Sequence, residues 1–150
     1  MVIEDWINET TDLIAAKYNE LGLRASGDFE RNLSGEYKQD EKSVRIEIKG
    51  VDYTYYLVNG RNPGSFPPVD AIMKWIDEKP INFDETEISK NSLAYLIGRK
   101  IATEGIKVPS ERNDGNLLES ISKQRVNKLT RDIGGELVEK ITSEIIKKWQ

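Results

Sequence analysis

The densest run of turn-forming residues in the chain lies at residues 59–68, and it constrains the fold more than any other feature of the sequence. It holds three of the five prolines and two of the eleven glycines. Proline fixes φ and lacks an N–H, and glycine adopts positive φ without steric cost, so the run cannot continue a helix or a strand. We expect an ordered, irregular loop, with Pro67 and Pro68 in the first turn of the next helix. The loop does not match a phosphate-binding loop, because no Gly-Lys-Ser/Thr follows it and prolines donate no N–H to an anion.

Before this loop the spacing of apolar residues changes from helical to strand-like. Seven large apolar residues share one stripe and predict a long amphipathic helix over residues 3–21: Ile3, Trp6, Ile7, Leu13, Ile14, Tyr18 and Leu21. Residues 43–49 alternate apolar and charged side chains, which predicts a half-buried strand. Residues 52–58 also alternate, and two strands this close in sequence are expected to pair as an antiparallel hairpin.

After the loop the pattern is helical again. It predicts helices over residues 68–79, 88–104 and 117–148, with an exposed polar loop over 107–116. Gly134 and Gly135 together cost roughly 2 kcal/mol relative to alanine in a helix, so we expect the last helix to break near 134. The prediction is a single α+β domain spanning residues 1–150. Its expected core residues are large and lie on the apolar faces: Trp6, Ile14, Ile46, Tyr55, Leu57, Ile72, Ile97 and Ile101.

The chain contains no histidine and no cysteine. This composition excludes Ser-His-Asp and Cys-His triads, Cys/His zinc sites and disulfides. We therefore expect no catalytic activity, no required metal and no cofactor. We also expect no membrane segment, because no apolar run approaches the roughly 20 residues that span a bilayer.

Charge is distributed unevenly along the chain. Residues 1–41 carry ten acidic and four basic residues, whereas residues 118–150 carry five acidic and seven basic residues. The formal net charge of −4 disfavours a wholesale DNA-binding role. The asymmetry fits an ordinary solvated surface first, and it would also suit head-to-tail contacts between copies.

The candidate site residues fall into two groups. One interpretation of the Gly-Pro loop is a rigid surface that presents Arg61, Asn62 and Phe66 to a partner. The alternative is a plain connector whose Phe66 folds onto the core. Tyr56 is a further interface candidate, because the alternation turns it away from Tyr53 and Tyr55. The second group is a modest basic patch that consists of Arg99, Lys100, Lys107 and Arg112. It is interpreted either as a solvated helix end or as a surface that faces DNA.

Two segments resemble a known family. They are YYLVNGRNPGSFPPVDAIMKWI at residues 55–76 and LAYLIGRKIATEG at residues 93–105. In this order they resemble the tail-completion or head–tail joining proteins of tailed bacteriophages. The sequence departs from the family pattern at Asn59, where a glutamate is common, and at residues 106–108, where Thr-Lys-Gly is usual.

The resemblance implies a non-enzymatic structural protein of the virion neck, in which a long helix packs on a small antiparallel sheet. It implies a homo-oligomeric ring, of six-fold or twelve-fold symmetry, that contacts portal or connector and tail proteins. It also implies assembly in the host cytoplasm, a final place in the virion, and a channel in which the basic patch approaches packaged DNA. The alternatives are a monomeric protein-binding module and a carboxylate-based enzyme.

Overall fold

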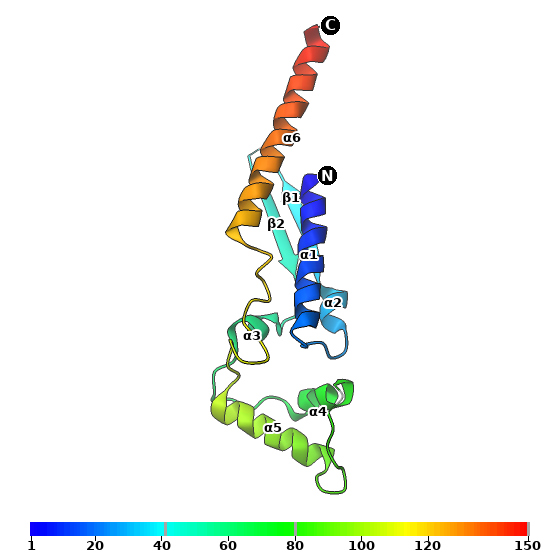
Figure 1. Ribbon diagram of the computed structural model, residues 1–150, viewed down its shortest axis with the longest axis vertical. Coiled ribbons are helices and arrows are strands. Elements are labelled where there is room, and N and C mark those ends of the chain that lie inside the picture. Colours follow the sequence, from blue (N-terminus) through cyan, green and yellow to red (C-terminus); the bar gives the residue numbers. More distant parts are fainter. Residues whose placement is uncertain (41, 80, 150) are drawn as a thin grey trace. The chain divides into compact units, whose positions relative to one another are not determined.

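The computed structural model describes residues 1–40, 42–79 and 81–149 (Figure 1). Within these residues the elements follow the order α1 (Val2–Glu20), α2 (Asp28–Asn32), β1 (Ser34–Gln39), β2 (Val44–Lys49), α3 (Thr54–Asn59), α4 (Val69–Glu78), α5 (Lys90–Glu104) and α6 (Lys123–Trp149). Helices with one antiparallel two-stranded sheet make this an α+β protein, as the sequence predicts. The chain forms two compact units. The first contains Met1–Ile14, Ser34–Lys49 and Leu118–Gln150, and the second contains Ala15–Leu33 and Gly50–Leu117.

The long helix α1 confirms the prediction for residues 3–21. Four members of the predicted stripe are buried, namely Ile3, Ile7, Ile14 and Tyr18. Trp6 and Leu21 are half-buried, and Leu13 is exposed. Acidic residues in the first turn suit the positive end of the helix dipole. The helix ends where Gly22 takes a φ of 67°, a value that glycine adopts without strain.

The sheet lies against α1 in the first unit. β1 and β2 are antiparallel, with Gly35 opposite Ile48 and Tyr37 opposite Ile46. A Cβ on Gly35 would lie 2.3 Å from Cγ2 of Ile7, so glycine at this position allows α1 to approach the strands. The N-terminal helix therefore packs on a small antiparallel sheet, as the resemblance implies.

The structure contradicts the predicted strand over residues 52–58. These residues contain the short helix α3, and the partner of the 43–49 strand is β1 on its other side. A six-residue run rich in tyrosine fits either conformation, so its tertiary contacts decide. β1 was hidden because a glycine occupies one of its inward positions, which leaves little apolar alternation to detect.

The core differs in part from the expected one. Ile14 and Ile72 are buried, and Trp6, Ile46, Leu57, Ile97 and Ile101 are half-buried. Tyr55 is 66% exposed, because it lies on α3 instead of on the inner face of a strand. The largest fully buried side chain is Phe29, from α2, which stacks on Tyr18 with 4.1 Å between ring centroids.

α4 and α5 form a helix pair in the second unit. Ile72 and Ile76 of α4 pack with Ala94 of α5, and all three are buried. The small side chain of Ala94 lets the two helices come close. Ser89 caps α5 by accepting a hydrogen bond from the Ser92 N–H.

The predicted break near residue 134 is absent, since α6 runs without interruption from Lys123 to Trp149. Its start lies six residues after the predicted one. Nothing lies within 4 Å of the position of a Cβ on Gly134 or Gly135. The helix therefore tolerates both glycines but gains no packing from them.

Replacing both glycines with alanine should strengthen α6. We expect each substitution to favour the helix by about 1 kcal/mol, because alanine loses less backbone entropy. The expected result is higher helicity by circular dichroism and slower amide hydrogen exchange over residues 134–149. Unchanged exchange would show that this half of α6 is stabilised by something other than its own helix propensity.

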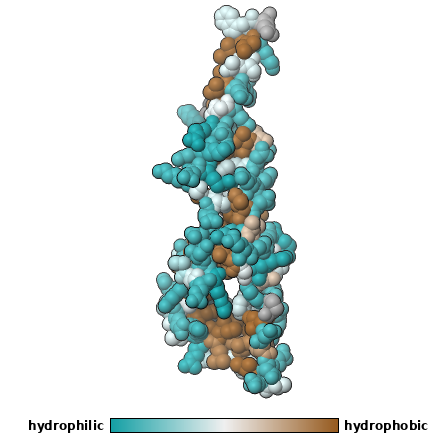
Figure 2. Space-filling view, in the orientation of Figure 1, coloured by the Kyte–Doolittle hydropathy of each residue, from teal (hydrophilic) through white to brown (hydrophobic). Residues whose placement is uncertain are grey.

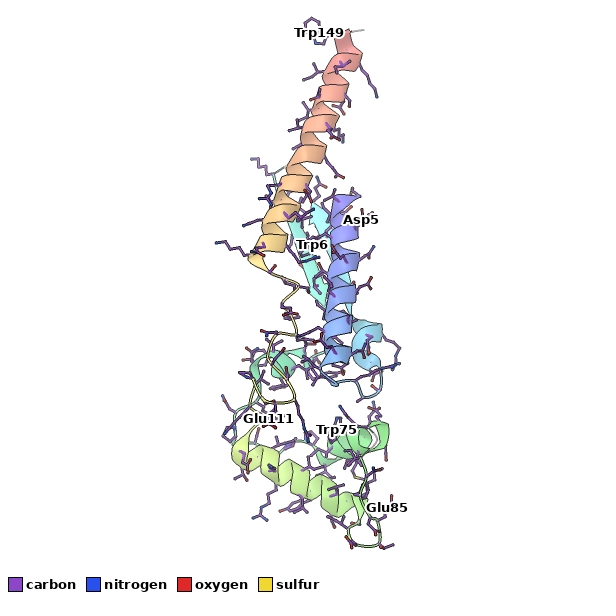
Figure 3. The ribbon with its side chains drawn as sticks, in the orientation of Figure 1. Asp5, Trp6, Trp75, Glu85, Glu111 and Trp149 are labelled. Carbon is purple, nitrogen blue, oxygen red and sulfur yellow. The ribbon has the colours of Figure 1, made fainter. Side chains whose placement is uncertain are left out.

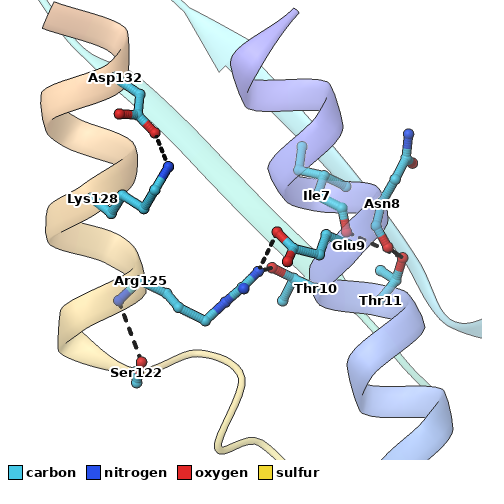
Figure 4. Close-up of polar contacts among 9 residues, drawn as sticks. All are labelled: Ile7, Asn8, Glu9, Thr10, Thr11, Ser122, Arg125, Lys128 and Asp132. Atoms are coloured by element: carbon cyan, nitrogen blue, oxygen red, sulfur yellow. Dashed lines mark hydrogen bonds and ion pairs between the residues drawn. The ribbon is translucent and has the colours of Figure 1, made fainter.

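An ion pair joins α6 to α1 in the first unit (Figure 4). Arg125 Nη2 lies 3.1 Å from Glu9 Oε2 and donates a hydrogen bond to Thr10 Oγ1 at the same distance. The guanidinium also lies over the Trp6 ring, 5.8 Å from its centroid. The hydrogen bond from Arg125 lowers the pKa of Glu9 below its usual value of 4.5.

This lowered pKa predicts a dependence of stability on pH. Because the folded-state pKa lies below the unfolded one, Glu9 stabilises the fold above pH 4.5 and loses that contribution as the pH falls below 4.5. Glu9→Gln should therefore destabilise the protein at neutral pH and flatten the acid limb of its stability profile. The measurement is the urea midpoint from about pH 7 to about pH 3. Asp12→Asn, on an exposed position of α1, is the control, and equal profiles for the two variants would contradict the prediction.

Candidate protein-docking site

Two glycines allow the Gly-Pro loop to lie directly against the residues that follow α5. Gly60 follows α3 and Gly105 follows α5, and their backbones adopt nearly the same conformation, with φ and ψ of 74° and −167° and of 72° and −165°. The residues after them, Arg61 and Ile106, exchange two backbone hydrogen bonds of 2.8 Å each. A Cβ on Gly60 would lie 2.2 Å from the Ile106 carbonyl oxygen, and one on Gly105 would lie 2.2 Å from that of Arg61. We call this arrangement the glycine clasp; a side chain at either position would overlap the backbone of the facing segment.

The rest of the loop is also held within the chain. The Gly64 N–H donates to the Ala102 carbonyl at 2.8 Å, and Pro67 is buried. Arg61 Nη2 donates to the Ser65 hydroxyl at 2.9 Å. Contacts with α5 and internal hydrogen bonds thus hold the loop against its own chain.

Phe66 packs on the core and is also partly exposed. Its ring packs on α5, where a Cβ on Gly98 would lie 2.6 Å from two ring carbons, and it meets Tyr95 at 5.5 Å between centroids. The side chain is nevertheless 42% exposed. Phe66 therefore anchors the loop with one face and offers the other face to solvent.

A groove of about 1130 Å³ opens beside the clasp in the second unit, and we call it the clasp groove. Four of the predicted site residues line it, coming from three separate segments: Tyr56, Arg61, Lys107 and Arg112. Asn62, Phe66, Arg99 and Lys100 are not among the residues that line it. Figure 2 shows the opening, with an apolar area of the α4–α5 pair next to it. The fold thus joins the loop and half of the basic patch into one surface.

Aromatic rings and cations share the walls of the clasp groove. The Arg61 guanidinium lies 5.9 Å from the centroid of the Tyr56 ring, a distance at which cation–π attraction acts. Trp75 of α4 and Glu111 of the 107–116 loop also line the groove (Figure 3). Burial raises the pKa of the Tyr53 phenol, so this ring stays neutral over the physiological range.

The 107–116 loop is ordered by contacts that the sequence pattern did not indicate. Asn113 is buried, and its Nδ2 donates to the Leu57 carbonyl at 2.7 Å. Lys17 pairs with Asp114 at 3.1 Å, which fixes the loop to the end of α1. These contacts position Lys107 and Arg112, whose side chains are exposed. The Asn-Asp-Gly sequence at 113–115 is a turn signal, but nothing in it indicates a contact with α3.

The clasp groove combines arginine with aromatic side chains. Arginine and aromatic residues are enriched in interfaces, and an arginine fork can hold a partner carboxylate through two hydrogen bonds. Within the described part of the chain, no cluster of three or more acidic residues is arranged to hold a metal ion. Nor does any helix in that part combine the length and the apolar character needed to cross a membrane.

Comparison with known proteins found no match among family models, curated proteins or solved structures.

Proposed function

We propose that this chain is a structural protein of the neck of a tailed bacteriophage, one subunit of a ring that joins the portal connector of the head to the tail. The observation that carries the proposal is the glycine clasp. The two segments that resemble the tail-completion family, residues 55–76 and 93–105, are joined by the hydrogen bond from the Gly64 N–H to the Ala102 carbonyl and by the close approach of Gly105 to the Arg61 carbonyl. A motif whose two halves support one rigid loop fits a role in presenting that loop to partners.

The residues of the clasp groove support a protein partner over DNA. Lys107 and Arg112 are accompanied there by Glu20 and Glu111, so the groove carries both signs of charge. A DNA-facing surface would gain from cations alone, because every phosphate is negative. Mixed charges beside aromatic rings suit a neighbouring neck protein with its own carboxylates and cations.

Deleting the gene from the phage that carries it tests the proposal. We expect the lysate to contain DNA-filled heads and separate tails in electron micrographs, and wild-type protein supplied from a plasmid should restore joined particles. The protein should also be found in purified wild-type virions by mass spectrometry. Joined, infectious particles from the deletion strain would contradict the proposal and favour a monomeric binding module with another role.

Charge reversal in the clasp groove should block joining without unfolding the chain. The test variant is Lys107→Glu with Arg112→Glu, since both side chains are exposed and line the groove. The matched control is Arg99→Glu with Lys100→Glu, since these are exposed on α5 outside the groove. We expect the first variant to restore less than a tenth of the wild-type plaque titre and the control to restore most of it. Equal titres would show that the groove is not the docking surface.

A further inference from the structure

The first unit contains a second, strongly apolar groove. Its volume is about 610 Å³, and it lies between β2 and the first half of α6, with Trp6 of α1 also lining it. The strand contributes Val44, Ile46 and Ile48, and α6 contributes residues that include Leu129 and Ile133. We call it the strand groove. Burial of such apolar surface is favourable, so an open groove of this composition favours an occupant.

The second half of the same helix exposes an apolar face. Six large side chains recur there at helical spacing and are between 47% and 87% exposed: Leu137, Val138, Ile141, Ile145, Ile146 and Trp149. The opposite side of this half carries polar residues such as Glu139, Lys140 and Ser143. We call residues 137–149 the tail. Figure 1 shows it extending past the strands and the start of α1, and Figure 2 shows apolar side chains along it.

The tail cannot fill the strand groove of its own chain. α6 is one uninterrupted helix, and its first half is itself a wall of the groove. At 1.5 Å per residue, Ile145 lies about 18 Å along the axis from Ile133. A helical segment as short as the tail is marginally stable in water unless it packs against another surface. We therefore expect another molecule to supply the surface on which the tail packs.

We propose that the tail of one copy lies in the strand groove of the next copy. Both surfaces are apolar, and each copy has one of each. The charges agree as well, since residues 118–150 carry a net charge of +2, whereas residues 1–41 carry a net charge of −6. A contact between unlike surfaces is heterologous, so it repeats from copy to copy and closes into a ring when the rotation permits.

The apolar area that the tail exposes is small for a stable dimer of two copies. The six tail side chains offer on the order of 400 Å², below the roughly 800 Å² per partner of a standard interface. One junction is therefore weak, but each subunit of a ring makes two. The proposed contact between copies rests on the proposed function only in that the resulting ring would be part of the phage neck.

Introduced cysteines test the arrangement directly, because the chain has none of its own. Thr130, in the strand groove, and Ile141, in the tail, are both exposed. They lie about 16 Å apart along one helix, so a short flexible bis-maleimide cannot join them within a copy. The full-length variant Thr130→Cys with Ile141→Cys should give a ladder of covalent dimers, trimers and larger forms. The matched control is Thr130→Cys with Ser143→Cys, whose second thiol lies on the polar side of the tail.

Each outcome decides the question. A ladder at least five-fold stronger than in the control supports the proposal. Strong dimers from Ile141→Cys alone would overturn it in favour of tail-to-tail pairing, and no product above the control would overturn it in favour of a different partner. The test needs no virions, so it separates the two proposals. A ladder from a chain that proves dispensable for joining refutes only the neck function, and an essential chain without a ladder refutes only this arrangement.

Discussion

Gly105→Ala should lower the free energy of unfolding by about 2–6 kcal/mol, and Gly60→Ala should do the same. Both glycines have φ near 73° with extended ψ, a region that residues with a Cβ enter at a cost of about 1–3 kcal/mol. Each new Cβ would also lie 2.2 Å from a carbonyl oxygen of the facing segment. The backbone shifts that relieve such overlap add about 1–3 kcal/mol and lengthen the hydrogen bonds between Arg61 and Ile106.

The control for the glycine clasp is Gly22→Ala. Gly22 has a φ of 67°, but nothing lies within 4 Å of a Cβ placed there. Gly22→Ala should therefore lower the free energy of unfolding only by the cost of placing alanine in a left-handed backbone conformation, about 1–2 kcal/mol. Urea unfolding of the three variants gives the comparison. Equal losses for Gly22→Ala and Gly105→Ala would mean that the two segments are not held together by the clasp.

Phe29→Ala should cost about 3–5 kcal/mol, the range for large aromatic truncations in a core. Phe29 is fully buried, stacks on Tyr18, and lies 6.5 Å from the ring centroid of Tyr53. Its removal leaves a cavity between α2, the end of α1 and the residues before α3. The short helix α2 has five residues, so it cannot move to fill the gap without losing its own structure.

Phe66→Ala is the matched control for this truncation. Phe66 is 42% exposed, so water replaces part of the lost contact and the cost should be clearly smaller. Chemical denaturation of both variants measures the difference. A loss from Phe29→Ala no larger than that from Phe66→Ala would show that the stack on Tyr18 is not part of the core.

Strong periodicity made part of this fold predictable. α1, α4 and α5 have one apolar stripe each, and β2 alternates Val44, Ile46 and Ile48 with charged residues. β1 could not be found in the same way, because Gly35 stands where an apolar side chain would show the alternation. The reason for glycine there is the approach of Ile7, a contact between distant residues.

The last helix illustrates the limit of local propensity. Gly134 and Gly135 predict a break, but the residues on both sides favour helix and no packing forces a bend. The alternation of residues 52–58 predicted a strand where the structure has a helix, since a run this short does not distinguish the two.

Part of the candidate site was visible in the sequence and part was not. Tyr56 and Arg61 belong to the Gly-Pro motif, so their proximity is local. Lys107 and Arg112 reach the same groove only because Asn113 bonds to Leu57 and Asp114 pairs with Lys17. These contacts join residues more than fifty positions apart, which no spacing rule predicts.

Joining heads to tails in vitro tests the central claim most directly. Purified chain is added to a lysate of the deletion strain, and the infectious titre is measured against its concentration. We expect wild-type chain to restore the titre and joined particles, whereas Lys107→Glu with Arg112→Glu should restore less than a tenth as much. A lysate that stays uninfectious with wild-type chain, or that is infectious without it, would contradict a role of this chain in joining.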